Sequence, residues 1–191
     1  LAYKSGVFPW YNEDEPILWW APQKRMVVVP KYYKMHKSMR NIFNRGEFDV
    51  TFNKDFYQVI TTCKNIYRKD QQGTWISDEI VEAYTKLYEM GLARSVEVWQ
   101  NKKLVGGLYG VDIGNGIFCG ESMFSKVSNA SKVAFYALLQ DLKEKNYLLL
   151  DCQVYNEHLE SLGAYEILRS EYMKYLLQGN ILLRIKKMKA L

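Results

Sequence analysis

The pattern of apolar and polar positions divides the chain into helical and strand-like segments. Apolar residues recur at helical spacing in residues 33–44, 55–64, 77–90, 130–145, 157–162 and 170–178. Short alternating or continuous apolar runs predict strands at residues 48–53, 94–100, 104–111, 117–124, 147–154 and 166–169. Residues 1–30 have no clean period. They predict extended segments with turns at 12–15 and 22–25, and residues 68–73 predict a polar loop.

The order of these segments predicts an α+β fold. Three strand-like runs, joined by turns at 101–103 and 112–116, predict an antiparallel meander that a helix and a buried strand then follow. That order is typical of acetyltransferase-like (GNAT-type) mixed sheets. We therefore expect a small N-terminal α/β domain over residues 1–46 and a larger GNAT-like domain over residues 47–191.

The residue content is that of a globular protein. The chain has 191 residues, of which 48% are hydrophobic, and its net charge of +5 permits contact with phosphate without requiring it. Cys63, Cys119 and Cys152 match no metal or redox spacing and predict reduced thiols in a cytoplasmic protein. No apolar run is long enough to span a bilayer, and no signal-peptide pattern opens the chain. Because the first residue is Leu1, we expect part of the natural N-terminus to be missing.

A carboxylate and an amide lie near the end of a strongly apolar strand-like segment. The two-residue period of a strand puts Asp151 and Gln153 on one face and Cys152 on the other. Such a pair can polarise and position an amine nucleophile. It can equally leave the core or cap the next helix, and the spacing alone slightly favours that second hypothesis.

Glu121 is an acidic residue within an apolar strand-like segment. A carboxylate in such a position needs a partner, which can be a cationic substrate or an internal Arg or Lys. His36 and His158 are isolated from any catalytic or metal-binding spacing, and we interpret both as structural.

Basic residues are concentrated before residue 46. Lys34, Lys37 and Arg40 share one face of the predicted helix 33–44, and others lie nearby in the sequence: Lys24, Arg25, Lys31 and Arg45. A basic stripe is usually a solvated helix face, and contact with nucleic-acid phosphates is the less common alternative.

Short sequence blocks carry a more specific signal than the periodicity does. They lie at residues 8–11 (FPWY), 16–22 (PILWWAP), 73–76 (GTWI), 97–99 (EVW), 104–110 (LVGGLYG), 118–125 (FCGESMFS), 129–132 (NASK), 151–154 (DCQV) and 161–164 (SLGA). Together and in this order they resemble the leucyl/phenylalanyl-tRNA–protein transferase family. The resemblance runs from about residue 1 to about residue 175.

The resemblance implies an aminoacyl transferase of the N-degron protein-degradation pathway. Such an enzyme transfers Leu or Phe, and less readily Met, from aminoacyl-tRNA to acceptor proteins that begin with Arg or Lys. It implies a GNAT-like aminoacyl-transferase domain, no metal and no organic cofactor. The expected partners are aminoacyl-tRNA and the acceptor protein, with no membrane, and we expect a cytoplasmic monomer.

The resemblance also implies residue roles. Asp151 orients or polarises Gln153, which holds the attacking α-amine, and Glu121 receives the Arg or Lys side chain of the acceptor. The implied aminoacyl pocket consists of Leu108, Phe118, Met123, Phe135, Leu138 and Leu150. The implied supports of the terminal adenosine and substrate are Trp10, Trp75 and Tyr84. The implied tRNA-contacting residues are Lys34, Lys37 and Arg40.

Two alternative functions remain open at this stage. An acyl-CoA-dependent N-acyltransferase would need a glycine-rich pyrophosphate loop before the helix 130–145, and residues 125–131 contain no glycine. A non-catalytic tRNA-binding module would not need Asp151 and Gln153. Both features favour the aminoacyl transferase.

Overall fold

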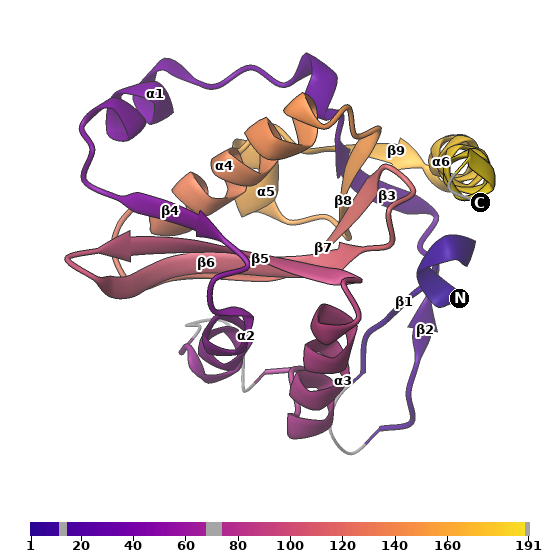
Figure 1. Ribbon diagram of the computed structural model, residues 1–191, viewed down its shortest axis with the longest axis horizontal. Coiled ribbons are helices and arrows are strands. Elements are labelled where there is room, and N and C mark those ends of the chain that lie inside the picture. The colour runs from indigo at the N-terminus through magenta and orange to yellow at the C-terminus, as the bar shows by residue number, and fades with distance from the viewer. Residues whose placement is uncertain (12–14, 68–73, 190–191) are drawn as a thin grey trace.

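The central feature is a seven-stranded mixed sheet. The computed structural model describes residues 1–11, 15–67 and 74–189 (Figure 1). The strands follow the order β4-β5-β6-β7-β8-β3-β9, and only β7 and β8 are parallel. Their bounds are β3 Lys24–Val28, β4 Asp49–Phe52, β5 Ala93–Gln100, β6 Lys103–Asp112, β7 Ile117–Ser125, β8 Leu149–Gln153 and β9 Tyr165–Leu168. The predicted α+β class and the antiparallel meander β5-β6-β7 are therefore confirmed.

Helices cover both faces of this sheet. The α-helices are α1 Lys37–Asn44, α2 Phe56–Asn65, α3 Asp78–Glu89, α4 Ala130–Glu144, α5 Glu157–Ser161 and α6 Arg169–Lys189. Figure 1 shows α4 and α1 on one side of the sheet and α2 and α3 on the other. A short ribbon of β1 (Phe8–Pro9) and β2 (Trp19–Trp20) and two 3-10 turns, Ala2–Ser5 and Pro30–Tyr32, complete the N-terminal part.

Local signals explain where several helices begin and end. Ser77 accepts a hydrogen bond from the Ile80 backbone N–H at 3.2 Å and so caps α3. Asp55 caps α2 in the same way, through the Gln58 N–H at 3.0 Å. Gly91 adopts a positive φ of 71° just after α3, a conformation that glycine enters without a steric cost.

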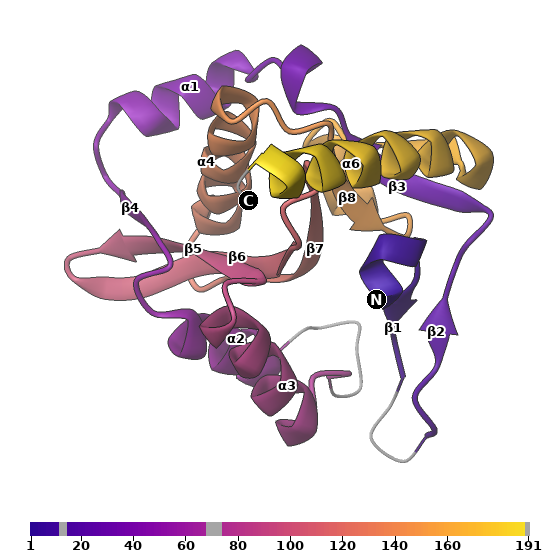
Figure 2. The ribbon, with the colours of Figure 1, turned by 45° about the vertical axis from the view of Figure 1, so that its right-hand side comes forward.

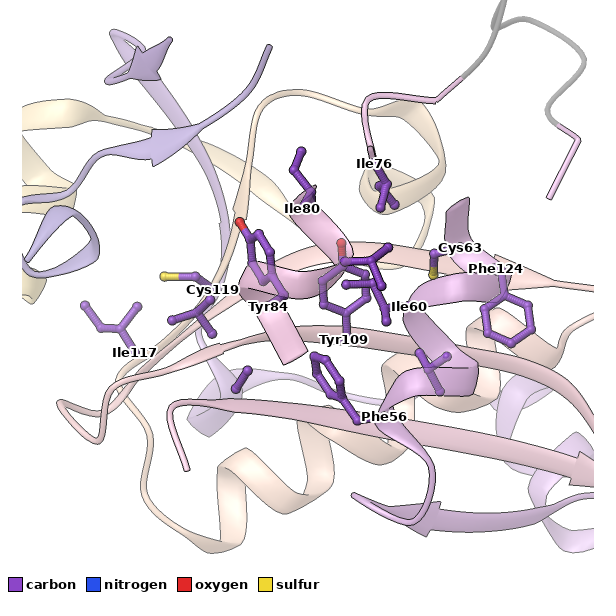
Figure 3. Packing of buried hydrophobic residues seen from close by; sticks show 14 of the residues in the cluster. Phe56, Ile60, Cys63, Ile76, Ile80, Tyr84, Tyr109, Ile117, Cys119 and Phe124 are labelled. Atoms are coloured by element: carbon purple, nitrogen blue, oxygen red, sulfur yellow. The ribbon is translucent and has the colours of Figure 1, made fainter. Parts of the chain in front are cut away.

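A hydrophobic core lies on each side of the sheet. On the α2–α3 side, the Tyr109 ring packs against Phe56 and Tyr84 with centroid distances of 5.7 and 5.6 Å (Figure 3). On the other side, α4 packs against Leu108 and Phe118 of the sheet. Burying each such side chain contributes about 1.5–3 kcal/mol, so these two layers hold the strands in register.

Some sequence predictions about the N-terminal part are wrong. The helix predicted at 33–44 begins only at Lys37, because the backbone of Tyr33 is extended after the 3-10 turn. Lys34 therefore does not share a helix face with Lys37 and Arg40. The second half of the turn predicted at 22–25, Lys24 and Arg25, is the start of β3, which lies between β8 and β9. The predicted turn at 12–15 lies mostly outside the described residues, and the predicted loop at 68–73 lies wholly outside them.

The C-terminal helix is longer than predicted. The periodicity predicts a helix at 170–178, whereas α6 continues to Lys189. The division into domains at residue 46 stays a prediction. None of the helices in the described part of the chain has the length and apolar character needed to span a bilayer. Within residues 1–11, 15–67 and 74–189 there is also no cluster of three or more potential metal ligands.

Candidate active site

A cavity lies where β7 and β8 separate. The two parallel strands pair at Ile117–Leu149, Phe118–Leu150 and Cys119–Asp151, and β7 then continues to Ser125 without this partner. The space beside the separated ends forms a cavity of about 350 Å³. Side chains from β6, β7, α4 and β8 form its walls, and Trp10 and Trp75 come in from the N-terminal ribbon and the segment before α3. A cavity of this size accommodates one amino-acid side chain and part of a larger ligand.

A β-bulge presents Glu121 to this cavity. Tyr109 pairs with Ser122 and Gly110 pairs with Gly120, so Glu121 is the extra residue on β7. Bulges interrupt the pairing of a strand and re-aim a side chain. The Glu121 carboxyl accepts hydrogen bonds from the hydroxyls of Tyr3 (2.8 Å) and Tyr84 (3.1 Å).

The third hydrogen bond of Glu121 comes from Gln153. Its Nε2 donates to Glu121 Oε1 at 3.1 Å. Among the described residues, the carboxyl is thus surrounded by two hydroxyls and one amide. The alternative that Glu121 pairs with an internal Arg or Lys is not what these residues show. Burial raises the pKa of Glu121 to about 7, although the hydrogen bonds from Tyr3, Tyr84 and Gln153 oppose this shift.

This raised pKa predicts a pH dependence of stability. Between the ordinary value of 4.5 and about 7, folded Glu121 holds a proton that the unfolded chain releases. The free energy of unfolding should therefore fall as pH rises through that window, by an amount of the order of 3 kcal/mol. In Glu121→Gln this fall should disappear, as measured by urea denaturation below and above the window. An unchanged pH dependence in the variant would assign the titration to another group.

Asp151 lies behind the cavity and does not line it. Its side chain is 0% exposed, and both oxygens accept hydrogen bonds from Arg25: Nε to Oδ1 at 2.8 Å and Nη2 to Oδ2 at 2.7 Å. The Tyr172 hydroxyl donates to Oδ2 at 3.0 Å. The Arg25 guanidinium lies 4.6 Å from the ring centroids of both Phe8 and Tyr172. Asp151 is thus the acceptor in a buried, bidentate ion pair held between aromatic rings.

Asp151 also fixes the backbone of Gln153. The Gln153 N–H donates to Asp151 Oδ1 at 2.9 Å, and Gln153 has a left-handed φ of 67°. This conformation is costly for a residue other than glycine and persists only where its surroundings impose it. Because Nε2 is bound to Glu121, the amide oxygen is the group of Gln153 left to accept a hydrogen bond from a ligand.

The face assignments of this strand are confirmed. Asp151 and Gln153 contact groups on the α3–α6 side of the sheet, whereas Cys152 packs against the α4 core. The capping hypothesis for the pair is wrong, because Asn156 caps α5 through the Leu159 N–H at 3.2 Å.

The structure brings most of the expected site residues to one cavity. Its walls include Trp10, Trp75, Leu108, Glu121, Met123, Phe135, Leu138, Leu150 and Gln153. Three others do not line it: Phe118 is buried beneath it, Tyr84 lies behind Glu121, and Asp151 lies behind Gln153. Lys34, Lys37 and Arg40 are exposed at or before α1, outside the cavity.

Several site residues escaped the sequence analysis. The sequence places Arg25 among the basic residues near the predicted phosphate contacts, and this prediction is wrong because its side chain is 2% exposed and paired with Asp151. The sequence offers one signal that Arg25 is buried. It lies two residues before Val27, and therefore on the same strand face as this apolar residue. Tyr3 and Tyr172 gave no signal at all. His158, which we interpret as structural from the sequence, lines the cavity. Its pKa is lowered, mainly by partial burial and to a smaller extent by the positive charge of Lys132.

Comparisons with known proteins identify the family of this chain. Residues 27–177 match the family model "Leucyl/phenylalanyl-tRNA protein transferase", and residues 1–23 match the model of its N-terminal domain. The chain is 62% identical over 176 residues to the leucyl/phenylalanyl-tRNA–protein transferase of Flavobacterium johnsoniae, covering 92% of this chain and 82% of that protein. It is 57% identical to the protein of that name from Flavobacterium psychrophilum, covering 92% and 83%. The chain belongs to the leucyl/phenylalanyl-tRNA–protein transferase family.

A solved structure shares the fold at much lower identity. A functionally unknown conserved protein from Staphylococcus epidermidis superposes with a TM-score of 0.50 and 7% identity, over 76% of this chain and 57% of that one. At this identity the likeness concerns the fold alone.

Proposed function

We propose that the protein transfers Leu or Phe, and less readily Met, from aminoacyl-tRNA to the N-terminal Arg or Lys of acceptor proteins. This forms a peptide bond and marks the acceptor in the N-degron protein-degradation pathway. The names of the relatives from both Flavobacterium species support the reaction. The observation that carries the proposal is the apolar cavity beside the Glu121–Gln153 pair.

The cavity wall suits a large apolar aminoacyl group. Leu108, Met123, Phe135, Leu138 and Leu150 provide a surface without charge. Flexible Met and Leu side chains adapt to the shapes of both Leu and Phe. Because a pocket rejects a substrate smaller by one methylene by only about 1–3 kcal/mol, selection among these amino acids is loose. We assign Phe118 a supporting role beneath this wall.

The reaction is the aminolysis of an ester. The neutral α-amine of the acceptor attacks the ester carbonyl, the new C–N bond forms, and the C–O bond to the terminal ribose breaks. The amine releases a proton, and the departing ribose oxygen takes one up. Little acid–base help is needed, because the ester is activated. Holding both reactants in an attacking geometry can lower the barrier by about 7–11 kcal/mol.

Gln153 and Asp151 have different parts in this step. We assign to the Gln153 amide oxygen a hydrogen bond from the attacking amine, which directs the nitrogen lone pair at the carbonyl. The contacts of Asp151 favour orientation over proton acceptance, since Arg25, Tyr172 and the Gln153 N–H already occupy its oxygens. Asp151 and Arg25 are then positioning residues, and Gln153 touches the reacting group.

The remaining cavity groups suit the other parts of the substrates. Glu121 is a carboxyl at the cavity edge without a basic partner among the described residues, which supports its role as the receiver of the acceptor's Arg or Lys side chain. Trp10 and Trp75 are aromatic walls on which the terminal adenine can stack, an interaction of about 1–3 kcal/mol. Tyr84 acts through Glu121, to which it donates a hydrogen bond.

Charged tRNA as the donor implies a cytoplasmic reaction.

We also assign the sheet to the GNAT type. The separation of the parallel strands β7 and β8 beside the cavity supports that assignment.

The decisive test is incubation of the purified chain with radiolabelled Leu-tRNA and a protein that begins with Lys. Label should pass to that protein and not to a matched protein that begins with Gly. Absence of transfer would overturn the proposal. Saturable binding of acetyl-CoA, followed in a titration, would support the acyl-CoA-dependent alternative. Binding of tRNA with no transfer would support the non-catalytic module.

The basic residues of α1 give a separate prediction about tRNA. Lys37 and Arg40 are exposed and make no ion pair within the described part of the chain. Replacing both by Ala should raise the KM for Leu-tRNA and reduce the slope of log KM against log salt by about 1 per lost phosphate contact. Lys102→Ala with Lys103→Ala, in the turn before β6 and at the first residue of β6, removes two exposed charges elsewhere and is the matched control. An unchanged salt slope would remove α1 from the tRNA surface.

A further inference from the structure

The C-terminal helix α6 has one face fixed against the rest of the protein. Tyr172 and Leu176 are buried in the core. One turn further, Gly179 lies so close to the backbone oxygen of Asn115 that a Cβ there would overlap it. The Asn180 side chain accepts from Asn115 Nδ2 at 3.3 Å and donates to the Lys4 carbonyl at 3.0 Å. These contacts determine which face of α6 is left to the solvent.

The free face of α6 carries an apolar stripe. Five apolar residues, spaced three or four positions apart, share one side of the helix: Met173, Leu177, Ile181, Ile185 and Met188. Their side chains are between 42% and 75% exposed, and Leu182 beside them is 43% exposed. The stripe extends over roughly 22 Å at 1.5 Å per residue. Figure 2 shows α6 at the front of the molecule with no other element over it. An exposed apolar surface of this extent on a fixed helix indicates an interaction site.

The same helix carries the net charge of the protein. Residues 172–191 contain no acidic residue and five basic ones: Lys174, Arg184, Lys186, Lys187 and Lys189. The net charge of the whole chain is +5, so the rest of the sequence is balanced. Lys174, Arg184 and Lys186 are exposed along with the stripe. The partner must therefore present both an apolar and a negatively charged surface.

Contrary to the expectation of no membrane partner, we propose that α6 binds the surface of an anionic lipid bilayer, with the apolar stripe at the boundary of the acyl chains and the basic residues at the headgroups. The exposed apolar side chains insert at such a surface, and the lysines and arginines interspersed along the same stretch of α6 meet its anionic headgroups. A second copy of the chain fits poorly, because pairing two such helices would bring like charges together. Phosphate contacts with tRNA account for the lysines but leave the six exposed apolar side chains unexplained.

The proposal is independent of the transfer reaction. Its apolar stripe lies mostly beyond residue 177, where the match to the family model ends. None of its residues lines the cavity or touches Asp151 or Glu121. Transfer from Leu-tRNA in solution is therefore expected to be unchanged by substitutions in the stripe.

The test is co-sedimentation of the full chain with vesicles of phosphatidylglycerol and phosphatidylcholine in equal parts. We expect binding to these vesicles and at least tenfold weaker binding to vesicles of phosphatidylcholine alone. The variant Leu177→Ser/Ile181→Ser/Ile185→Ser should lose roughly tenfold or more in partitioning. Arg184→Gln with Lys186→Gln should lose roughly fivefold per charge. The matched control is Tyr57→Ser with Met90→Ser, which removes exposed apolar side chains on α2 and after α3 and should bind normally.

Three results would overturn this proposal. The first is equal or absent binding to the two kinds of vesicle. The second is a loss of affinity for deacylated tRNA in the Arg184–Lys186 variant, with vesicle binding intact in the apolar variant, which would make α6 an RNA surface. The third is a dimer in analytical ultracentrifugation that the apolar variant dissociates, which would assign the stripe to a second copy. Circular dichroism of each variant checks that α6 is still formed.

Discussion

Replacing Arg25 by Met is expected to lower the free energy of unfolding by about 3–5 kcal/mol. The substitution leaves the Asp151 carboxylate fully buried without its counter-charge, and an uncompensated buried charge is among the most destabilising changes a single residue can make. Met can fill much of the space between Phe8 and Tyr172, but it lacks the guanidinium that lies over both rings, so the lost cation–π contacts add to the effect. Urea denaturation at neutral pH measures the difference.

Two further variants separate charge from geometry. Arg25→Lys keeps the positive charge but cannot make the bidentate contact, so we expect a smaller loss of stability together with reduced transfer. Arg25→Met with Asp151→Leu removes both charges and should recover much of the stability, because a buried ion pair is often replaceable by apolar groups. Transfer should remain low in this double variant, since the Gln153 N–H has lost its acceptor. A double variant with normal kcat would mean that Asp151 serves folding alone.

The helices and strands that the sequence predicted well are those with local signals. Helix α3 follows directly from the Ser77 cap and the Gly91 stop, and the meander β5-β6-β7 follows from two turns between apolar runs. The N-terminal part was predicted less well for a physical reason. β3 is stabilised by pairing with β8 and β9, which lie more than 120 residues further along the chain. No local period reports such pairing.

The same difference between local signals and long-range contacts separates the site residues that the sequence reveals from those that it does not. Asp151, Gln153 and Glu121 were identified because a polar residue in an apolar strand is visible in the sequence itself. Their partners were not, because Arg25 reaches Asp151 across 126 positions of the sequence and Tyr3 reaches Glu121 across 118. Family resemblance supplied the cavity wall, and spacing alone would not have done so. The ordering of the site into a cavity layer and a buried supporting layer emerges only in three dimensions.

Removing the Gln153 side chain is expected to lower kcat/KM for transfer by about 100-fold or more. The amide oxygen is the group that we assign to the attacking amine, and a misplacement of about 1 Å in such a reaction already costs that much. The measurement is label transfer from Leu-tRNA to a Lys-initiated protein at limiting acceptor concentration. The control is Cys152→Ala, since Cys152 lines the same cavity and packs on the α4 side. It should keep near-normal transfer.

The choice of replacement distinguishes chemistry from strain. Gln153 has a φ of 67°, which Ala adopts at a cost of about 1–2 kcal/mol and Gly adopts freely. Gln153→Gly should therefore be the more stable of the two variants, while both lose the amide and the hydrogen bond to Glu121. If activity follows stability, so that the Gly variant regains transfer, the backbone conformation at this position matters and the amide does not. Equal loss of transfer in two variants of different stability is the result that the proposed role of the Gln153 amide requires.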